Sequence, residues 1–318
     1  MKSKKKSQAA SAVLMIRPKH FGFNPETAVN NVFQKKIKKN KQTIRKKALE
    51  EFNHFTHLLK KYFVDVIVME DQSDAVCPDA VFPNNWFSTH HDGRVVLYPM
   101  VAPNRRLERR EDVFKILQTK YKFKNTGFAN LTYYENAGLY LEGTGSMVFD
   151  HVNKIAYANK SSRTSTTTAR LLCLMLNYTP ELFTAHSKRG KEIYHTNVMM
   201  TVAQDFAVVC AESITSKKER NRVIKKLTST GHEIIDLTFN QVEKFAGNML
   251  QVKNKRGELI TIMSRSAFEC LADDQLEIVL KYGKILAVPI PMIEAVGGGS
   301  VRCMMAEIFL PRGKSRAK

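Results

Sequence analysis

The strongest constraint on the fold is a repeated pattern of predicted secondary structure. Segments rich in Val, Ile and Leu alternate with amphipathic segments and polar loops, and the group recurs about five times along the chain. The period is loose, at roughly 45–60 residues, which is typical of radial or stacked architectures built from similar units. We therefore predict an α/β fold of related units, each directing one polar loop towards a common centre.

Hydrophobic periodicity locates the elements of these units. Apolar residues at helical spacing predict helices over about 43–62, 108–121, 163–177, 216–228 and 266–281. β-Branched runs predict strands over about 12–16, 63–69, 93–100, 154–159, 181–186, 206–211, 233–237, 259–263 and 285–288. A strand broken by Glu142–Ser146 is expected within about 138–150, another opens near 247–250, and about 20–34 reads as loop. We expect one catalytic domain over 12–312, after a basic disordered leader (1–11) and before a basic tail (313–318).

Composition excludes several classes of protein. The net charge of +20 could attract nucleic acid or an anionic surface, but the lysines cluster at the ends of the chain and on one predicted helix. No aromatic RNA-binding motif accompanies them, so we favour a solvated lysine-rich surface over a nucleic-acid binder. No apolar run is long enough to predict a membrane span. The five cysteines form no CxxC pair, which favours a reduced, cytoplasmic protein without a zinc site.

The polar loops of the repeated units carry Asp79, Glu142, His195, Asn248 and Cys303. Cys303 follows a run of three glycines, whose backbone N–H groups are open to a closely approaching ligand. A thiolate held there could attack a carbon atom while the histidine moves protons and the carboxylate orients the imidazole. The alternative is a glycine turn before a core element, with Cys303 as a small buried hydrophobic residue.

The loop over 77–90 has an unusual composition. It holds the only tryptophan of the chain, two prolines, two asparagines and Asp79. Loops rich in such groups often form binding sites, although a rigid turn with capping side chains would use the same residues.

These loops carry a resemblance to the guanidine-modifying enzymes, which include arginine deiminases, dimethylarginine hydrolases and amidinotransferases. The chain is most similar to the branch of citrulline-utilisation hydrolases. The matching stretches occur in order at 15–18, 79–86, 98–106, 142–146, 195–200, 247–250 and around Cys303. The resemblance implies the pentein fold, a five-bladed α/β propeller with pseudo-fivefold symmetry, and a site that uses neither metal nor cofactor.

The resemblance also assigns roles to individual residues. It implies that Cys303 is the nucleophile, His195 the general acid and base, and Glu142 the residue that orients His195. The residues that it implies in substrate binding are Asp79, Phe82, Asn84, Asn85, Arg106, Arg163, Asn197 and Asn248. Arg106, with or without Arg105, and Arg163 would hold a substrate carboxylate, because a forked guanidinium binds carboxylates bidentately. The two adjacent arginines could instead be a surface pair ahead of a helix.

The chain departs from the arginine deiminases at acidic positions. Asn197 stands where those enzymes have a second acid, and an asparagine or His90 ends the substrate-binding loop in place of an aspartate. Glycine, threonine and glycine follow Glu142 where the family has Gly-Gly-Asp. Fewer carboxylates leave less charge to hold a guanidinium, whereas amides can pair with a neutral ureido group.

The leading hypothesis is therefore a hydrolase of C–N bonds other than peptide bonds, in linear amidines or ureido compounds. Its small-molecule partner would be a guanidino or ureido amino acid such as arginine, a methylarginine or citrulline, cleaved through a covalent thio-intermediate. Transfer of an amidino group to an amine is an alternative, and a non-catalytic pentein binding module is another. A homo-oligomer is compatible with the sequence.

Overall fold

The computed structural model describes residues 7–71 and 75–313, and within them the strands form five three-stranded sheets of one plan. In each sheet the middle strand pairs antiparallel with one neighbour and parallel with the other. The strands of sheet 1 are β15 (Ala306–Glu307), β1 (Ala12–Arg17) and β2 (Asp65–Glu70); of sheet 2, β3 (Phe87–Thr89), β4 (Arg94–Leu97) and β5 (Gly127–Asn130); of sheet 3, β6 (Met147–Asp150), β7 (Ile155–Asn159) and β8 (Thr179–Phe183); of sheet 4, β9 (Met200–Val202), β10 (Phe206–Val209) and β11 (Glu233–Asp236); and of sheet 5, β12 (Leu250–Lys253), β13 (Leu259–Ser264) and β14 (Lys284–Val288).

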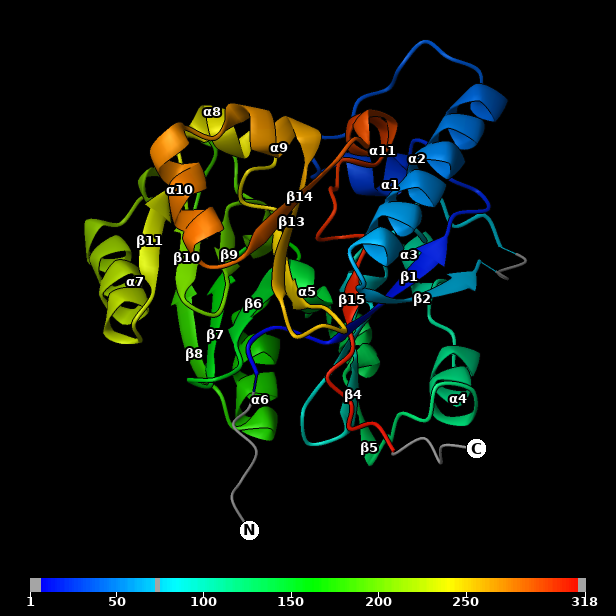
Figure 1. Ribbon diagram of the computed structural model, residues 1–318, viewed down its shortest axis with the longest axis horizontal. Helices are drawn as coiled ribbons and strands as arrows, with labels where there is room; N and C mark the ends of the chain where they lie inside the picture. The colour runs from blue at the N-terminus through cyan, green and yellow to red at the C-terminus, as the bar shows by residue number, and fades with distance from the viewer. Residues whose placement is uncertain (1–6, 72–74, 314–318) are drawn as a thin grey trace.

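The parallel pair in every sheet is joined through helices, because parallel neighbours require a crossover connection. These helices lie at the periphery of the molecule (Figure 1). In sheet order they are α2 (Lys41–Lys61), α4 (Asp112–Thr119), α6 (Thr166–Leu176), α7 (Lys217–Ser229) and the pair α9 (Arg265–Cys270) and α10 (Asp273–Lys281). We call one sheet with its helix and the loop ahead of its first strand a module. The predicted repeat of five α/β units is thus confirmed.

The longest helix illustrates how the sequence sets these elements. α2 begins after Asn40, whose side chain accepts a hydrogen bond from the Thr43 backbone N–H, as expected of an N-cap. One face of the helix is fully buried, with Ala48, Phe52, Phe55 and Leu59 at helical spacing. This face packs against the core that also contains Cys303.

The first sheet is assembled from both ends of the described chain. β15 pairs antiparallel with β1, with Ala306 opposite Leu14 and Glu307 opposite Val13. The last module therefore closes against the first, and the five sheets form a ring.

Several element boundaries differ from the prediction. The expected loop at 20–34 contains a short helix, α1 (Pro25–Ala28), which starts at a proline and is capped by Asn24. The expected last helix is two helices, because Leu271 and Ala272 adopt extended backbone angles between α9 and α10. The part of the predicted strand ahead of Glu142, at 138–141, is not a strand in the structure. After Glu142 a one-turn helix, α5 (Gly143–Ser146), leads directly into β6. The sequence also did not reveal α11 (Pro291–Gly297), which carries the chain into the glycine loop.

The segment predicted as a leader is packed where it is described. Residues 1–6 of that segment, and 314–318 of the predicted tail, lie outside the described residues. Gln8, however, is buried; its side-chain amide donates to the carbonyls of Phe149 and Val202, and its Oε1 accepts from the His151 N–H. The packed chain thus extends N-terminally beyond the predicted boundary at residue 12. None of the helices in the described ranges has the length and hydrophobicity needed to cross a membrane.

Candidate active site

The loops ahead of the first strand of each module meet at the centre of the ring. Asp79, Glu142, His195, Asn248 and Cys303, one from each of these loops, are all buried. A small, partly open cavity of about 20 Å³ lies beside Asp79, His195 and Cys303. Its lining consists of Thr27, Asn31, Asp79, Phe82, Asn85, Arg105, Arg163, Tyr194, His195, Gly297, Gly298, Gly299 and Cys303. A space of this size holds about one water molecule.

His195 and Glu142 form a buried pair. The imidazole Nε2 lies 2.8 Å from Glu142 Oε2, while Oε1 accepts a hydrogen bond of 3.0 Å from the Val101 N–H. Burial lowers the pKa of His195 to about 4, against the opposing hydrogen bond and charge of Glu142. Burial alone would raise the pKa of Glu142, but Arg163 and His195 outweigh it and bring that pKa well below its usual range. At neutral pH the pair is therefore a neutral imidazole held by a carboxylate, which is the state of a general base.

The loop after Glu142 needs glycine for steric reasons. A Cβ at Gly145 would lie 2.7 Å from His195 Nδ1 and 2.4 Å from Asn85 Nδ2. A Cβ at Gly143 would lie 2.3 Å from the Asn84 carbonyl oxygen, and its φ of +49° is in the left-handed region. These two glycines let the modules that carry Asn85 and His195 approach each other closely.

Cys303 sits in a turn after α11. That helix ends at Gly298, which has a left-handed φ of +65°, and the Cys303 N–H donates to the Ser300 carbonyl at 3.0 Å. The thiol Sγ lies 3.4 Å from Asn248 Nδ2 and 3.7 Å from Asn197 Nδ2. Asn248 is itself oriented by the Arg302 N–H, which donates to its Oδ1 at 3.2 Å. Two amide N–H donors thus face the sulfur.

Four buried polar atoms around the cavity have no hydrogen-bond partner within the described ranges. They are Asp79 Oδ1, Asn84 Oδ1, Asn85 Nδ2 and Asn197 Oδ1. Asp79 Oδ2, in contrast, accepts from Asn24 Nδ2 at 2.8 Å and from the Thr27 hydroxyl at 3.0 Å. Since buried polar groups are normally satisfied, this group of three acceptors and one donor is suited to a polar ligand.

The predicted arginines occupy different environments. Arg163 lines the cavity, but its guanidinium is already engaged with Glu142 Oε2 at 3.3 Å, the Thr27 carbonyl at 3.0 Å and Asn30 Oδ1 at 3.0 Å. Arg106 lies outside the cavity lining and donates to the carbonyls of Met100 and Val101.

The arginine of the adjacent pair that lines the cavity is Arg105. It is buried, paired with Glu108 at 2.9 Å, and donates to Asn85 Oδ1 at 2.7 Å. Of the two arginines predicted to hold a substrate carboxylate, Arg105 therefore lines the cavity and Arg106 does not. The preceding short helix, α3 (Pro103–Arg106), directs adjacent residues to different sides, which the sequence did not disclose.

The remaining predicted residues divide into two groups. Phe82 and Asn85 line the cavity, and Asn197 and Asn248 contact the sulfur. Asn84 is buried but does not line the cavity, and its Nδ2 donates a hydrogen bond of 3.2 Å to the Thr144 hydroxyl.

The sequence did not indicate the contribution of residues 24–31. Asn24 and Thr27 hold Asp79, while Thr27 and Asn31 close one side of the cavity. Tyr194, next to His195, donates its hydroxyl to the Gly298 carbonyl at 2.8 Å and so ties the histidine loop to the glycine loop. The Asn24–Pro25 dipeptide was the only local signal, and it indicates a turn rather than a site. In the part of the chain that the structure describes, no cluster of His, Cys, Asp and Glu is arranged to hold a metal ion.

Comparison with models of known protein families shows the family to which this chain belongs. The family model for the eukaryotic N,N dimethylarginine dimethylhydrolases matches residues 17–310. The chain belongs to this family. The match covers modules two to five in full and includes the histidine and cysteine loops, while almost all of β1 precedes it. A search of curated proteins found no match.

Solved structures of the same superfamily confirm the pentein fold. Apo ArgZ, an arginine dihydrolase from the ornithine–ammonia cycle in cyanobacteria, superposes with a TM-score of 0.71 at 18% identity. The alignment covers 95% of this chain but only 41% of ArgZ, so this chain spans about two fifths of that relative. The N-terminal domain of ArgZ bound to substrate aligns over 94% of this chain and 99% of that domain, with a TM-score of 0.70 at 18% identity. A histidine-to-glycine variant of dimethylarginine dimethylaminohydrolase was solved as an adduct with S-methyl-L-thiocitrulline. The alignment covers 94% of this chain and 100% of that enzyme, with a TM-score of 0.63 at 14% identity.

Proposed function

We propose that this protein is a cysteine-dependent hydrolase that cleaves a C–N bond of a guanidino or ureido amino acid. The observation that carries the proposal is the convergence of Cys303, His195 and Glu142 beside four unpaired buried polar atoms. Membership of the dimethylarginine dimethylhydrolase family supports it. Residues 12–312 would act as one catalytic unit.

In the proposed reaction, His195 takes the proton of the Cys303 thiol, and Sγ forms a bond to the central guanidino or ureido carbon to give a tetrahedral adduct. The C–N bond then breaks as His195 gives a proton to the leaving amine, leaving a covalent thio-intermediate. His195 next takes a proton from water, and the resulting hydroxide adds to the same carbon. The C–S bond then breaks to release the product, and His195 returns the proton to the Cys303 sulfur, which restores the neutral imidazole and the thiol. Glu142 holds the imidazole in one tautomer and stabilises it whenever it is protonated.

The unpaired atoms indicate how the headgroup could be held. The acceptors on Asp79 and Asn197 suit N–H donors, whereas Asn85 Nδ2 suits a carbonyl oxygen. Asp79 is the only cavity-lining carboxylate of the described residues, and burial raises its pKa. A neutral ureido or weakly charged headgroup is therefore favoured over free arginine, because a buried guanidinium needs compensating charge.

An assay of C–N cleavage tests this proposal directly. The purified protein is incubated with dimethylarginine, arginine and citrulline, and release of dimethylamine or ammonia is measured with and without an amine acceptor. We expect cleavage of at least one compound without the acceptor and none by Cys303→Ala. Product formation only with an acceptor would establish the amidinotransferase alternative. Binding without any turnover would establish a non-catalytic pentein, and turnover by Cys303→Ala would refute the mechanism.

A further inference from the structure

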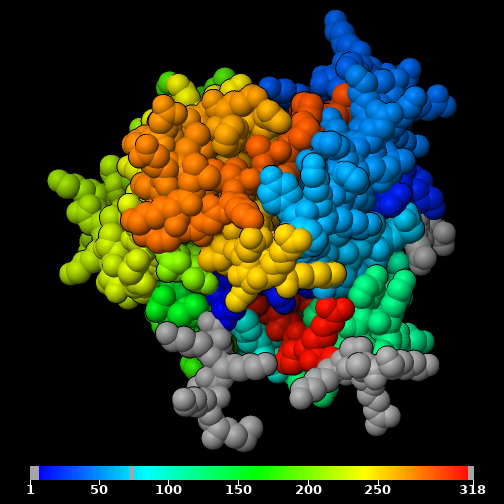
Figure 2. Space-filling view, in the orientation of Figure 1, coloured from blue at the N-terminus to red at the C-terminus, as the bar shows by residue number. Residues whose placement is uncertain are grey.

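A groove on the outer surface of the ring lies outside the candidate active site. It runs over β14 between α2 of the first module and α9 and α10 of the fifth, with a volume of about 610 Å³. In Figure 2 the light-blue surface of α2 and the orange surface of α9 and α10 adjoin along this line. The volume falls within the range of small-molecule sites, roughly 300–1,000 Å³.

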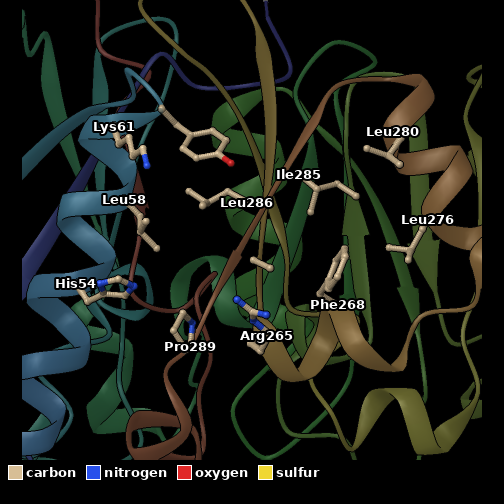
Figure 3. Close-up of a pocket in the computed structure, with 12 residues that line it drawn as sticks. His54, Leu58, Lys61, Arg265, Phe268, Leu276, Leu280, Ile285, Leu286 and Pro289 are labelled. Carbon is tan, nitrogen blue, oxygen red and sulfur yellow. The ribbon is translucent and has the colours of Figure 1, made fainter.

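The walls and the floor of this groove are apolar. Figure 3 shows Leu58 projecting from α2 on one side, Leu276 and Leu280 from α10 on the other, and Ile285 and Leu286 from β14 between them. Leu280 is 57% exposed. The groove thus offers unburied apolar surface to a ligand.

The rim of the groove carries two positively charged side chains. Lys61 extends from α2 and Arg265 from α9 around the apolar floor, with His54 beside them (Figure 3). Across residues 7–71 and 75–313, neither His54 nor Lys61 has an acidic side chain within ion-pairing distance. Arg265 reaches Glu269 only at 4.0 Å, the limit of an ion pair. The rim is therefore free to neutralise a negative group.

The pseudo-symmetry of the ring supplies an internal comparison. The equivalent groove lies over β8 between α6 and α7 and has the same volume, about 610 Å³. Its lining carries both signs of charge, with Arg222 paired to Glu181 and Lys160 paired to Glu219 at 3.3 Å. A groove at this position of a module can therefore carry both acidic and basic side chains. The groove beside α2 therefore differs from the groove over β8 in both its apolar floor and the charge of its rim.

We propose that the groove beside α2 is a binding site for a small organic anion with an apolar body, such as an aliphatic or aryl carboxylate. The anionic group would pair with the basic rim, and the body would cover the leucines. The same charge disfavours other occupants: a second copy of the chain would bring a net charge of +20, and its terminal segments are rich in lysine.

Fluorescence titration with 8-anilinonaphthalene-1-sulfonate tests the site, with decanoate and decylamine as competitors. We expect one high-affinity probe molecule per chain, displaced by decanoate and not by decylamine. Leu280→Gln and Arg265→Glu should each weaken probe binding by about tenfold. The matched controls are Leu174→Gln, at a leucine that is 79% exposed on α6, and Arg170→Glu in the equivalent groove. Both controls should bind the probe like the wild type.

The opposite results would overturn the proposal. Equal loss of binding in the control variants would show that the probe responds to overall charge or to any exposed leucine. Equal competition by decanoate and decylamine would show that the rim has no role. Several weak probe sites per chain would show non-specific adsorption. Circular dichroism spectra and C–N cleavage rates of all four variants should match the wild type, so that a binding loss reports on the groove alone.

Discussion

His195 Nε2 lies 2.8 Å from Glu142 Oε2, and both side chains are buried between neighbouring modules. The carboxylate fixes the tautomer of the imidazole and offsets its positive charge after proton transfer. We predict that Glu142→Gln lowers kcat by about 100-fold or more with little change in KM. Steady-state kinetics on the substrate identified above would measure this. Glu233→Gln, at a peripheral ion pair with Lys281, is the control and should keep wild-type kcat. Equal activity in both variants would contradict the assigned role.

The backbone at Gly145 makes room for the same imidazole. A methyl group there would lie 2.7 Å from His195 Nδ1, so Gly145→Ala must displace either the ring or Asn85. We predict a fall in kcat of about 100-fold or more, because a displacement of about 1 Å is enough for such a loss. Gly22→Ala is the control, since its added methyl group would meet only the His20 carbonyl oxygen at 3.9 Å. Near-normal kcat in Gly145→Ala would show that the loop adapts and that His195 is not tightly positioned.

The cysteines should differ in reactivity. Burial raises the pKa of Cys173 to about 12 and that of Cys210 to about 11, so both stay protonated at neutral pH. Cys303 instead faces amide donors at the cavity. We predict that limiting iodoacetamide labels Cys303 before Cys173 and Cys210, and that a bound substrate analogue slows the labelling. Peptide mass spectrometry would measure the order. Faster labelling of Cys173 or Cys210 would count against an activated thiol.

Arg163 connects Glu142 to the segment over 24–31. Removing its guanidinium removes the buried ion pair with Glu142. The hydrogen bonds from Arg163 to the Thr27 carbonyl and to Asn30 Oδ1 are lost as well. We therefore predict that Arg163→Ala lowers kcat as well as raising KM, whereas Arg106→Ala, outside the cavity lining, changes either by less than about threefold. If Arg163→Ala alters KM alone, the residue binds substrate and does not support Glu142.

Glu51 gives a prediction for the pH dependence of stability. Its carboxylate on α2 accepts from the Met292 and Ile293 N–H groups at the start of α11, yet burial raises its pKa to about 7 from 4.5. Between these two values the folded state binds more protons than the unfolded state. The free energy of unfolding contributed by this group is therefore greatest below pH 4.5, decreases as the pH rises to about 7, and is constant above.

Glu51→Gln should remove that decrease. Urea denaturation of wild type and variant at pH 5 and pH 8 would measure the difference in unfolding free energy at each pH. We expect the variant to gain stability relative to the wild type at pH 8 compared with pH 5. A difference independent of pH would show that Glu51 titrates normally.

Much of the site could be predicted from the sequence because its residues precede strands. Glu142, His195, Asn248 and Cys303 each stand just ahead of an apolar run, so their loops were assigned to equivalent positions and do meet. Arg105 and Arg106 could not be distinguished, because the side on which each points is set by one turn of helix that has no periodic signal. Asn24, Thr27 and Asn31 were missed for a related reason: their loop is defined by tertiary contacts with Asp79 and the glycine loop rather than by local pattern.

The pairing of Leu14 with Ala306 has a consequence for how the protein is made. During synthesis on a ribosome, β1 is translated before the other strands described here, and its antiparallel partner β15 is translated after all of them. Sheets 2 to 5 can pair from neighbouring sequence, but the first sheet depends on a contact of very large sequence separation, which is slow to form. Cys303 lies just ahead of that late strand, so His195 and Glu142 are both translated before the proposed nucleophile. The site proposed here is therefore complete only after the ring has closed.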